Sequence, residues 1–115
     1  MKLQAEQMLL RIHVSNLVRW HGQPLYEALV EHAHEAGIAA ATVLHGPMGF
    51  GRHSHVHSAK VTDLSVSLPV VIELVDSEEA IQRFLPTADE LVREGMMTLE
   101  KVTISRFGSP GADSG

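Results

Sequence analysis

The chain has 115 residues, which is the size of one domain with a single core. Fourteen acidic residues against nine Lys and Arg give a formal net charge of −5, which disfavours general nucleic-acid binding because phosphates require clustered basic side chains. The absence of cysteine excludes a disulfide framework, a thiolate nucleophile and a Cys-ligated metal site.

Residues 1–107 are expected to form one domain, and residues 108–115, mostly Gly, Ser, Pro and Ala, a disordered tail. No apolar run approaches the roughly 20 residues that span a bilayer, and the N-terminus lacks the pattern of a secretory signal. We therefore expect a cytoplasmic protein without direct membrane insertion.

Apolar residues alternate with other residues over positions 8–14, which predicts a strand with one buried face. A helix is predicted to begin at Pro24, a favourable first helical position, and to end at Gly37. Residues 39–44 then read as a short strand that runs into the glycine-rich loop 46–51.

Every even position from Leu64 to Leu74 is apolar, which predicts a third strand. Pro69 within it favours an edge position or a bulge, because proline cannot donate to a central ladder. Asp76, with Glu79 in a capping box, is expected to start a second helix that ends at Gly95, with Pro86 kinking or interrupting it. Alternation over 99–107 predicts the last strand.

This order, βαββαβ, predicts a ferredoxin-like α+β fold with a four-stranded antiparallel sheet and two helices on one face. Leu9, Val71 and Val75 would point to the other face, beside Glu73. That face is half apolar, and another copy of the chain would cover it most simply. We therefore expect an oligomer.

The sequence Gly46–His53, GPMGFGRH, is the first candidate site. Glycines allow backbone N–H groups to turn toward an anion, and Arg52 offers a fork of donors for phosphate or carboxylate. The motif matches neither the phosphate loop of nucleotide hydrolases nor the dinucleotide fingerprint. The alternative is that it is only a connection between strands.

Three histidines, His53, His55 and His57, alternate in the same segment. Alternate residues of an extended chain face one side, so the three imidazoles could converge on zinc, copper or nickel. Solvated loop histidines are the alternative. The pattern leaves open a metal-binding or metal-responsive protein.

No nucleophile, cofactor motif or acid/base pair stands out, so we expect a protein that is not an enzyme. A small ferredoxin-like enzyme with a cleft as its active site is the weakest alternative.

The segment HGQPLYEALVEHAHEAGIAAATVLHGPMGFG, residues 21–51, followed by LPVVIELVDSEEAI, closely resembles the uncharacterised PII-like family of small bacterial and archaeal proteins. The resemblance covers nearly the whole chain except the tail. In addition, GFGR at residues 49–52 looks like the GFGR that opens the mobile loop of the nitrogen-regulatory PII proteins.

This resemblance implies a homotrimer that binds a small effector, classically an adenine nucleotide, in its intersubunit clefts. A long loop would contact a target protein, and a membrane transporter or channel is the suggested target. His53 stands where PII proteins carry a glutamine that helps to hold magnesium, and Val70 replaces a lysine that supports 2-oxoglutarate binding, so that effector is not expected. The implied nucleotide-binding residues are Gly49, Gly51, Arg52, His53, Lys101 and Arg106.

Overall fold

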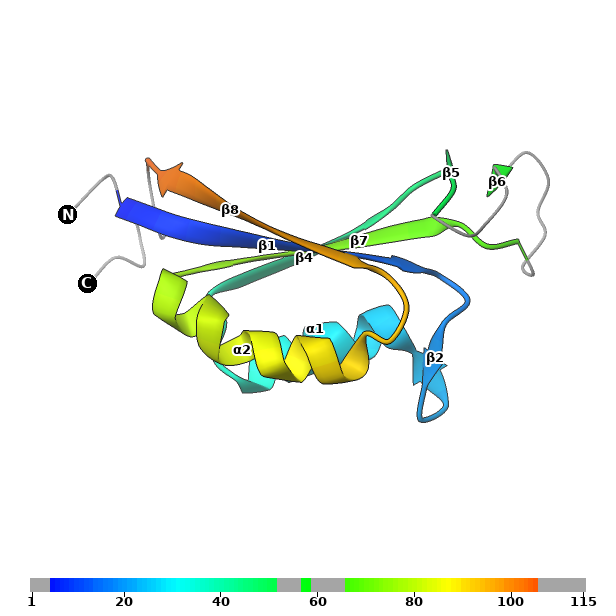
Figure 1. The fold of residues 1–115 in the computed structure, drawn as a ribbon, viewed down its shortest axis with the longest axis horizontal. Helices are drawn as coiled ribbons and strands as arrows, with labels where there is room; N and C mark the ends of the chain where they lie inside the picture. Colours follow the sequence, from blue (N-terminus) through cyan, green and yellow to red (C-terminus); the bar gives the residue numbers. More distant parts are fainter. Residues whose placement is uncertain (1–4, 52–56, 59–65, 106–115) are drawn as a thin grey trace, which may run out of the picture.

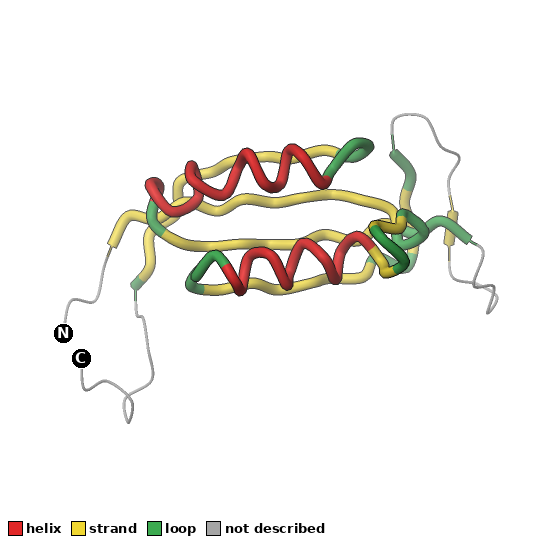
Figure 2. Tube along the Cα trace, turned by 90° about the horizontal axis from the view of Figure 1, so that it is seen from below, coloured by secondary structure: helices red, strands yellow, loops and turns green. Residues whose placement is uncertain are grey.

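The computed structural model describes residues 5–51, 57–58 and 66–105. Its centre is a four-stranded antiparallel sheet in the order β4-β7-β1-β8, with two helices side by side on one face (Figures 1 and 2). The sheet strands are β1 (Ala5–Ser15), β4 (Ala40–His45), β7 (Pro69–Asp76) and β8 (Met96–Ile104). The helices are α1 (Leu25–Glu35) and α2 (Glu78–Leu91). The predicted ferredoxin-like α+β fold is confirmed.

Two short strand pairs lie at the end of the sheet opposite the start of β1 and the end of β8 (Figure 1). One is a hairpin of β2 (Arg19–Trp20) and β3 (Gln23–Pro24), and the other pairs β5 (Met48–Gly49) with β6 (His57–Ser58). Sequence patterns predicted neither pair, because two-residue strands are too short to show alternation.

The core lies between the helices and the even-numbered residues of the two central strands. Leu10 and Ile12 of β1 and Ile72 and Leu74 of β7 are completely buried there. The helices contribute the apolar stripes predicted from helical spacing, and these buried residues are Leu25, Ala28, Leu29, Ala33, Ile81, Phe84, Ala88 and Leu91. Burial of these apolar side chains is the main driving force of the fold.

Helix α1 ends where Gly37 was expected to end it. The amide of Gly37 donates to the carbonyl of His34 at 3.1 Å, and the amide of Ile38 donates to that of Ala33 at 3.0 Å. This pair of bonds is the Schellman motif, which satisfies the last carbonyls of a helix. At its start, Pro24 is the residue before the helix rather than its first residue.

Helix α2 begins one residue later than predicted. Ser77, not Asp76, is the N-cap, and its hydroxyl accepts from the amide of Ala80 at 3.1 Å. Asp76 instead accepts from the amides of Ser77 at 2.6 Å and Ala39 at 2.9 Å, which ties the end of β7 to the start of β4. The helix continues through Pro86 and ends at Leu91, four residues before Gly95.

The prediction that Pro69 marks an edge strand or a bulge was wrong. Strand β7 lies between β4 and β1, in the interior of the sheet. Pro69 is its first residue, opposite Ser15 at the end of β1, and a proline is tolerated at the start of a strand. The strand therefore begins at 69, and positions 66–68 precede it without strand structure.

The last strand begins at Met96, three residues earlier than predicted, directly after Gly95. A Cβ at position 95 would lie 2.5 Å from the carbonyl oxygen of His13. A glycine is therefore required where the chain passes from α2 to β8 against β1. The predicted end of the strand, Phe107, lies outside the described residues.

Candidate functional site

The glycine-rich segment after β4 is held against the start of β7. The amide of Gly46 donates to the carbonyl of Pro69 at 2.8 Å. A Cβ on Gly46 or Gly49 would lie 2.7 or 2.9 Å from Cγ of the Pro69 ring. Close packing against this ring thus accounts for two of the glycines, so their presence alone does not require a bound anion.

The β5–β6 pair closes the base of the loop that follows. Met48 lies opposite Ser58, and Gly49 lies opposite His57. Met48 and Phe50 are 60% and 68% exposed, so this base presents apolar side chains to its surroundings. The strand pair holds the two ends of the intervening segment together at this end of the sheet.

The predicted nucleotide-binding residues are distributed over the molecule. Gly49 is half-buried in β5, and Gly51 is exposed just after it. Lys101 is exposed on β8, opposite Met8. It lies on the edge of the sheet opposite β4, and five residues beyond Met96, on the order of 15 Å along the strand from that end of β8. A single copy of the chain does not bring Gly49 and Lys101 together.

The remaining residues of the predicted site, Arg52, His53 and Arg106, lie outside the described residues. So do His53 and His55 of the predicted metal site, while His57 is placed in β6 by its backbone alone. Across residues 5–51, 57–58 and 66–105, no group of three or more His, Asp or Glu side chains is arranged to hold a metal ion. The histidine-loop hypothesis stays a prediction.

The open face of the sheet carries an ionic cluster between apolar neighbours. Arg11 of β1 donates from Nε to Glu73 of β7 at 2.8 Å and from Nη1 to Glu100 of β8 at 3.1 Å. The hydrogen bond to Glu73, together with the two carboxylate charges, raises the pKa of Arg11 above its ordinary value. The guanidinium thus remains charged at any ordinary working pH.

Apolar residues surround this cluster, as expected from the sequence. The row of directly paired residues nearest the loop base is Leu44, Val71, His13 and Met96, and Leu44 and Met96 are 49% and 54% exposed. On the other side of the cluster Leu9 pairs with Val75 and is only 7% exposed. The face is therefore half apolar, with paired charges at its middle.

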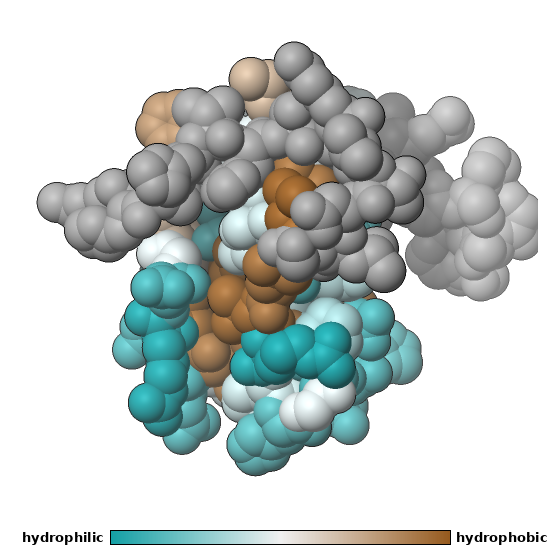
Figure 3. All heavy atoms as spheres, turned by 90° about the vertical axis from the view of Figure 1, so that its right-hand side faces the viewer, coloured by the Kyte–Doolittle hydropathy of each residue, from teal (hydrophilic) through white to brown (hydrophobic). Residues whose placement is uncertain are grey.

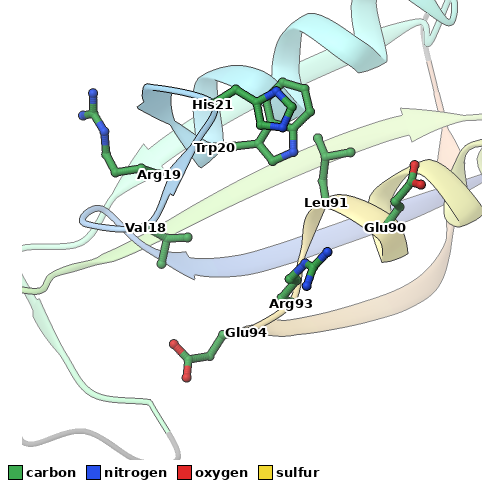
Figure 4. Close-up of a pocket in the computed structure, with 8 residues that line it drawn as sticks. All are labelled: Val18, Arg19, Trp20, His21, Glu90, Leu91, Arg93 and Glu94. Carbon is green, nitrogen blue, oxygen red and sulfur yellow. The ribbon is translucent and has the colours of Figure 1, made fainter.

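A hollow of about 660 Å³ lies between the β2–β3 hairpin and the end of α2 (Figure 4). Eight residues line it: Val18, Arg19, Trp20, His21, Glu90, Leu91, Arg93 and Glu94. We call it the hairpin pocket. At this end of the molecule, an apolar strip lies between two hydrophilic flanks (Figure 3).

The turn between β2 and β3 positions the pocket residues Arg19, Trp20 and His21. His21 and Gly22 both have positive φ, +49° and +85°, the combination of a type I′ turn between two-residue strands. Arg19 donates from Nη2 to the carbonyl of Gly22 at 2.6 Å and so fastens the turn. The ring of His21 stacks on Trp20, with centroids 3.9 Å apart and planes 3° from parallel.

Sequence reasoning missed this pocket. Its lining comes from two segments about 70 positions apart, so no local pattern unites Arg19 with Arg93. The sequence does contain one local signal of the hairpin. Gly22 lies two residues before Pro24, and glycine and proline are common at tight turns.

Comparison with known structures shows the class of the fold. A putative PII-like signaling protein from Thermus thermophilus superposes with a TM-score of 0.63 at 19% identity, over 88% of this chain and 91% of that one. CPII from Thiomonas intermedia K12, solved with ADP and bicarbonate, gives 0.61 at 16% identity, over 90% and 92%. The protein thus has a PII-like fold.

Sequence comparison then gives the family. Residues 7–104 match the DUF190 family, described as Uncharacterized ACR, and the chain belongs to it. A UPF0166 protein of Aquifex aeolicus (strain VF5) is 38% identical over 99 residues, which cover 86% of this chain and 93% of that protein. The resemblance to an uncharacterised PII-like family is confirmed. Within the described residues, no helix is long and apolar enough to cross a membrane.

Proposed function

We propose that this protein is a homotrimeric PII-like regulator in the cytoplasm that binds an adenine nucleotide in the clefts between its copies. It senses the nucleotide and controls a partner, a membrane transporter or channel, rather than catalysing a reaction. Within the proposed cleft, Gly49, Gly51, Arg52 and His53 come from the loop base, while Lys101 and Arg106 come from a neighbouring copy.

The observation that carries this proposal is the PII-like fold together with a strand-closed loop base after β4. The fold matches CPII over 90% of this chain, and CPII was solved with ADP. The loop begins at a segment held to Pro69 and paired through Gly49 and His57. A loop anchored at both ends can present Arg52 to a phosphate while its middle contacts another protein.

The separation of the predicted residues favours a shared site. Gly49 follows β4 and Lys101 lies on β8, at opposite edges of the sheet, so in this proposal different copies supply them to one ligand. The open face of the sheet gives a second argument for assembly. Its apolar residues, including Leu44 and Met96, lack a cover among the described elements, and a second and third copy would bury them.

Native mass spectrometry of the untagged protein tests the assembly and the ligand together. We expect a trimer that takes up as many nucleotides as it has copies when ATP, ADP, AMP or a cyclic nucleotide is added. A monomer, or a trimer that binds none of them, would contradict the proposal.

Two variants test whether the cleft is shared. Arg52→Ala and Lys101→Ala should each weaken nucleotide binding, by roughly 1.5 to 3 kcal/mol if a charged hydrogen bond is lost. Arg83→Ala, a change at an exposed arginine of α2, should leave binding unchanged. When the two binding-defective variants are unfolded and refolded together, mixed trimers contain some clefts with both side chains intact, so part of the binding should return. No recovery would mean that the two residues do not meet across copies.

A further inference from the structure

The charges that line the hairpin pocket are of both signs. Arg19 and Arg93 are cations, and Glu90 and Glu94 are anions. Among the residues that the structure describes, none of these four side chains forms an ion pair, since both salt bridges there belong to Arg11. The lining is thus electrically neutral as a whole but divided locally into positive and negative groups.

The floor of the pocket is apolar and rigid. Leu91 is 5% exposed within the core, and Val18 and Trp20 pack against that core. Trp20 is held from two sides, by His21 stacked on its face and by the ring of His32 edge-on at 5.2 Å. His32 is itself fixed, with Nδ1 2.8 Å from the carbonyl oxygen of Ala28. The indole is therefore a fixed wall of the pocket.

The end of α2 adds a second source of negative potential. The helix ends at Leu91 and carries no basic residue in its last turn. The partial negative charge of a helix C-terminus favours a cation nearby. Glu90 and Glu94 come from either side of this terminus and point away from each other, with Arg93 between them (Figure 4). An aromatic ring such as Trp20 also attracts an ammonium group.

We infer that the hairpin pocket binds a small zwitterion, an α-amino acid with an apolar side chain. Its ammonium group would lie toward Glu94 and the end of α2. Its carboxylate would accept from the guanidinium of Arg93, and its side chain would cover Val18 and Leu91. The volume of about 660 Å³ is within the range of small-molecule sites.

Other ligand classes fit the lining less well. A nucleotide brings two or more negative charges, which Glu90 and Glu94 would repel. A simple cation or anion gains from one pair of charged side chains and loses from the other pair. A neutral apolar molecule leaves all four charges without a partner. The site shares no residue with the nucleotide cleft proposed above, so the two proposals can be tested independently.

The single tryptophan of the chain reports directly on this pocket. L-Leucine is titrated while Trp20 fluorescence is followed, beside two analogues that each lack one charge, 3-methylbutylamine and 4-methylpentanoate. We expect a saturable response to leucine and at least roughly tenfold weaker binding of each analogue, because each loses a charged hydrogen bond.

Variants assign the two charged ends. In Arg93→Gln, leucine should bind no more tightly than 3-methylbutylamine. In the double variant Glu90→Gln/Glu94→Gln, leucine should bind no more tightly than 4-methylpentanoate. Arg83→Gln and Glu79→Gln make the same changes toward the other end of α2 and should leave the titration unaltered.

Three outcomes would overturn the inference. The first is a response to AMP or ADP but not to leucine, which would assign the pocket to nucleotides. The second is equal binding of leucine and both analogues, which would show an apolar site that ignores charge. The third is no saturable response to any of these compounds, while the same protein preparation remains folded by circular dichroism.

Discussion

On the helix side of the sheet, the middle of β1 and β7 is apolar, and Leu10, Ile12, Ile72 and Leu74 are fully buried. On the open side, the same two strands contribute Arg11 and Glu73, bonded at 2.8 Å, with Leu9 and Val75 beside them. One face is thus built for folding. The other combines apolar area, which drives association, with fixed charges, which restrict how a partner can dock.

Leu10, buried under the helices, and Leu44, exposed on the open face, separate the two roles most strongly. Leu10→Ala should lower the free energy of unfolding by about 2 to 5 kcal/mol, because it leaves a cavity in the core. Leu44→Ala, at a side chain that is 49% exposed on the open face, should cost the isolated chain less and weaken self-association instead. Urea unfolding and sedimentation measure the two effects. If both variants lose the same stability and associate equally well, the distinction between the faces fails.

The second test concerns the end of the sheet, where Pro69 projects from the open face. Gly46→Ala would bring a Cβ to 2.7 Å from the Pro69 ring and should cost about 1 to 3 kcal/mol by overpacking. Adding Pro69→Ala removes the ring atom concerned, so the double variant should recover much of that loss. A double-mutant cycle in urea measures the coupling, and purely additive effects would show that the ring does not set the loop base.

The third test concerns helix α2, which covers one face of the sheet together with α1. Ser77→Ala removes the N-cap of α2 and should cost about 1 kcal/mol, measured by thermal or urea unfolding. Glu79→Ala, at the position where a capping box was predicted, should have a smaller effect, because the residue three positions after the N-cap is Ala80, whose amide donates the cap bond to Ser77. A larger loss of stability in Glu79→Ala than in Ser77→Ala would instead support the capping box predicted from the sequence.

The smallest effect on the folded chain is expected at Arg11. Its partners Glu73 and Glu100 are partly exposed, so Arg11→Met should barely change unfolding by urea. In an assembly that covers the open face, however, the variant leaves two carboxylates without a cation, and association should weaken clearly. Glu100→Gln keeps the Arg11–Glu73 pair and is the matched control. Unchanged association of Arg11→Met would remove the cluster from the interface.

The fold was largely predictable because alternation and helical spacing are local patterns. The buried even positions of β1 and β7 and the stripe of α2 show it directly. The errors arose where a residue has two structural uses. Pro69 was interpreted as an edge residue although it can also begin a central strand, and Asp76 was interpreted as a cap although it binds the amide of Ala39. Both choices depend on tertiary partners.

The candidate sites were less predictable. The glycine-rich segment was predicted either to bind an anion or to be only a connection between strands, and Gly46 and Gly49 pack on Pro69, which is 20 or more residues away in sequence. The hairpin pocket joins residues 18–21 to residues 90–94, and its hairpin consists of strands too short to recognise. Pairings between distant segments of this kind carry no signature in a single sequence.

The strand order also governs how the chain can fold. The central pair, β1 and β7, comes from distant parts of the chain, as the separation of 62 positions between Arg11 and Glu73 shows. The ends of a long segment must meet before this register forms, and that loss of chain entropy precedes any gain from the core. We therefore expect folding to be limited by the meeting of these two strands, while α1 and its Schellman end form early.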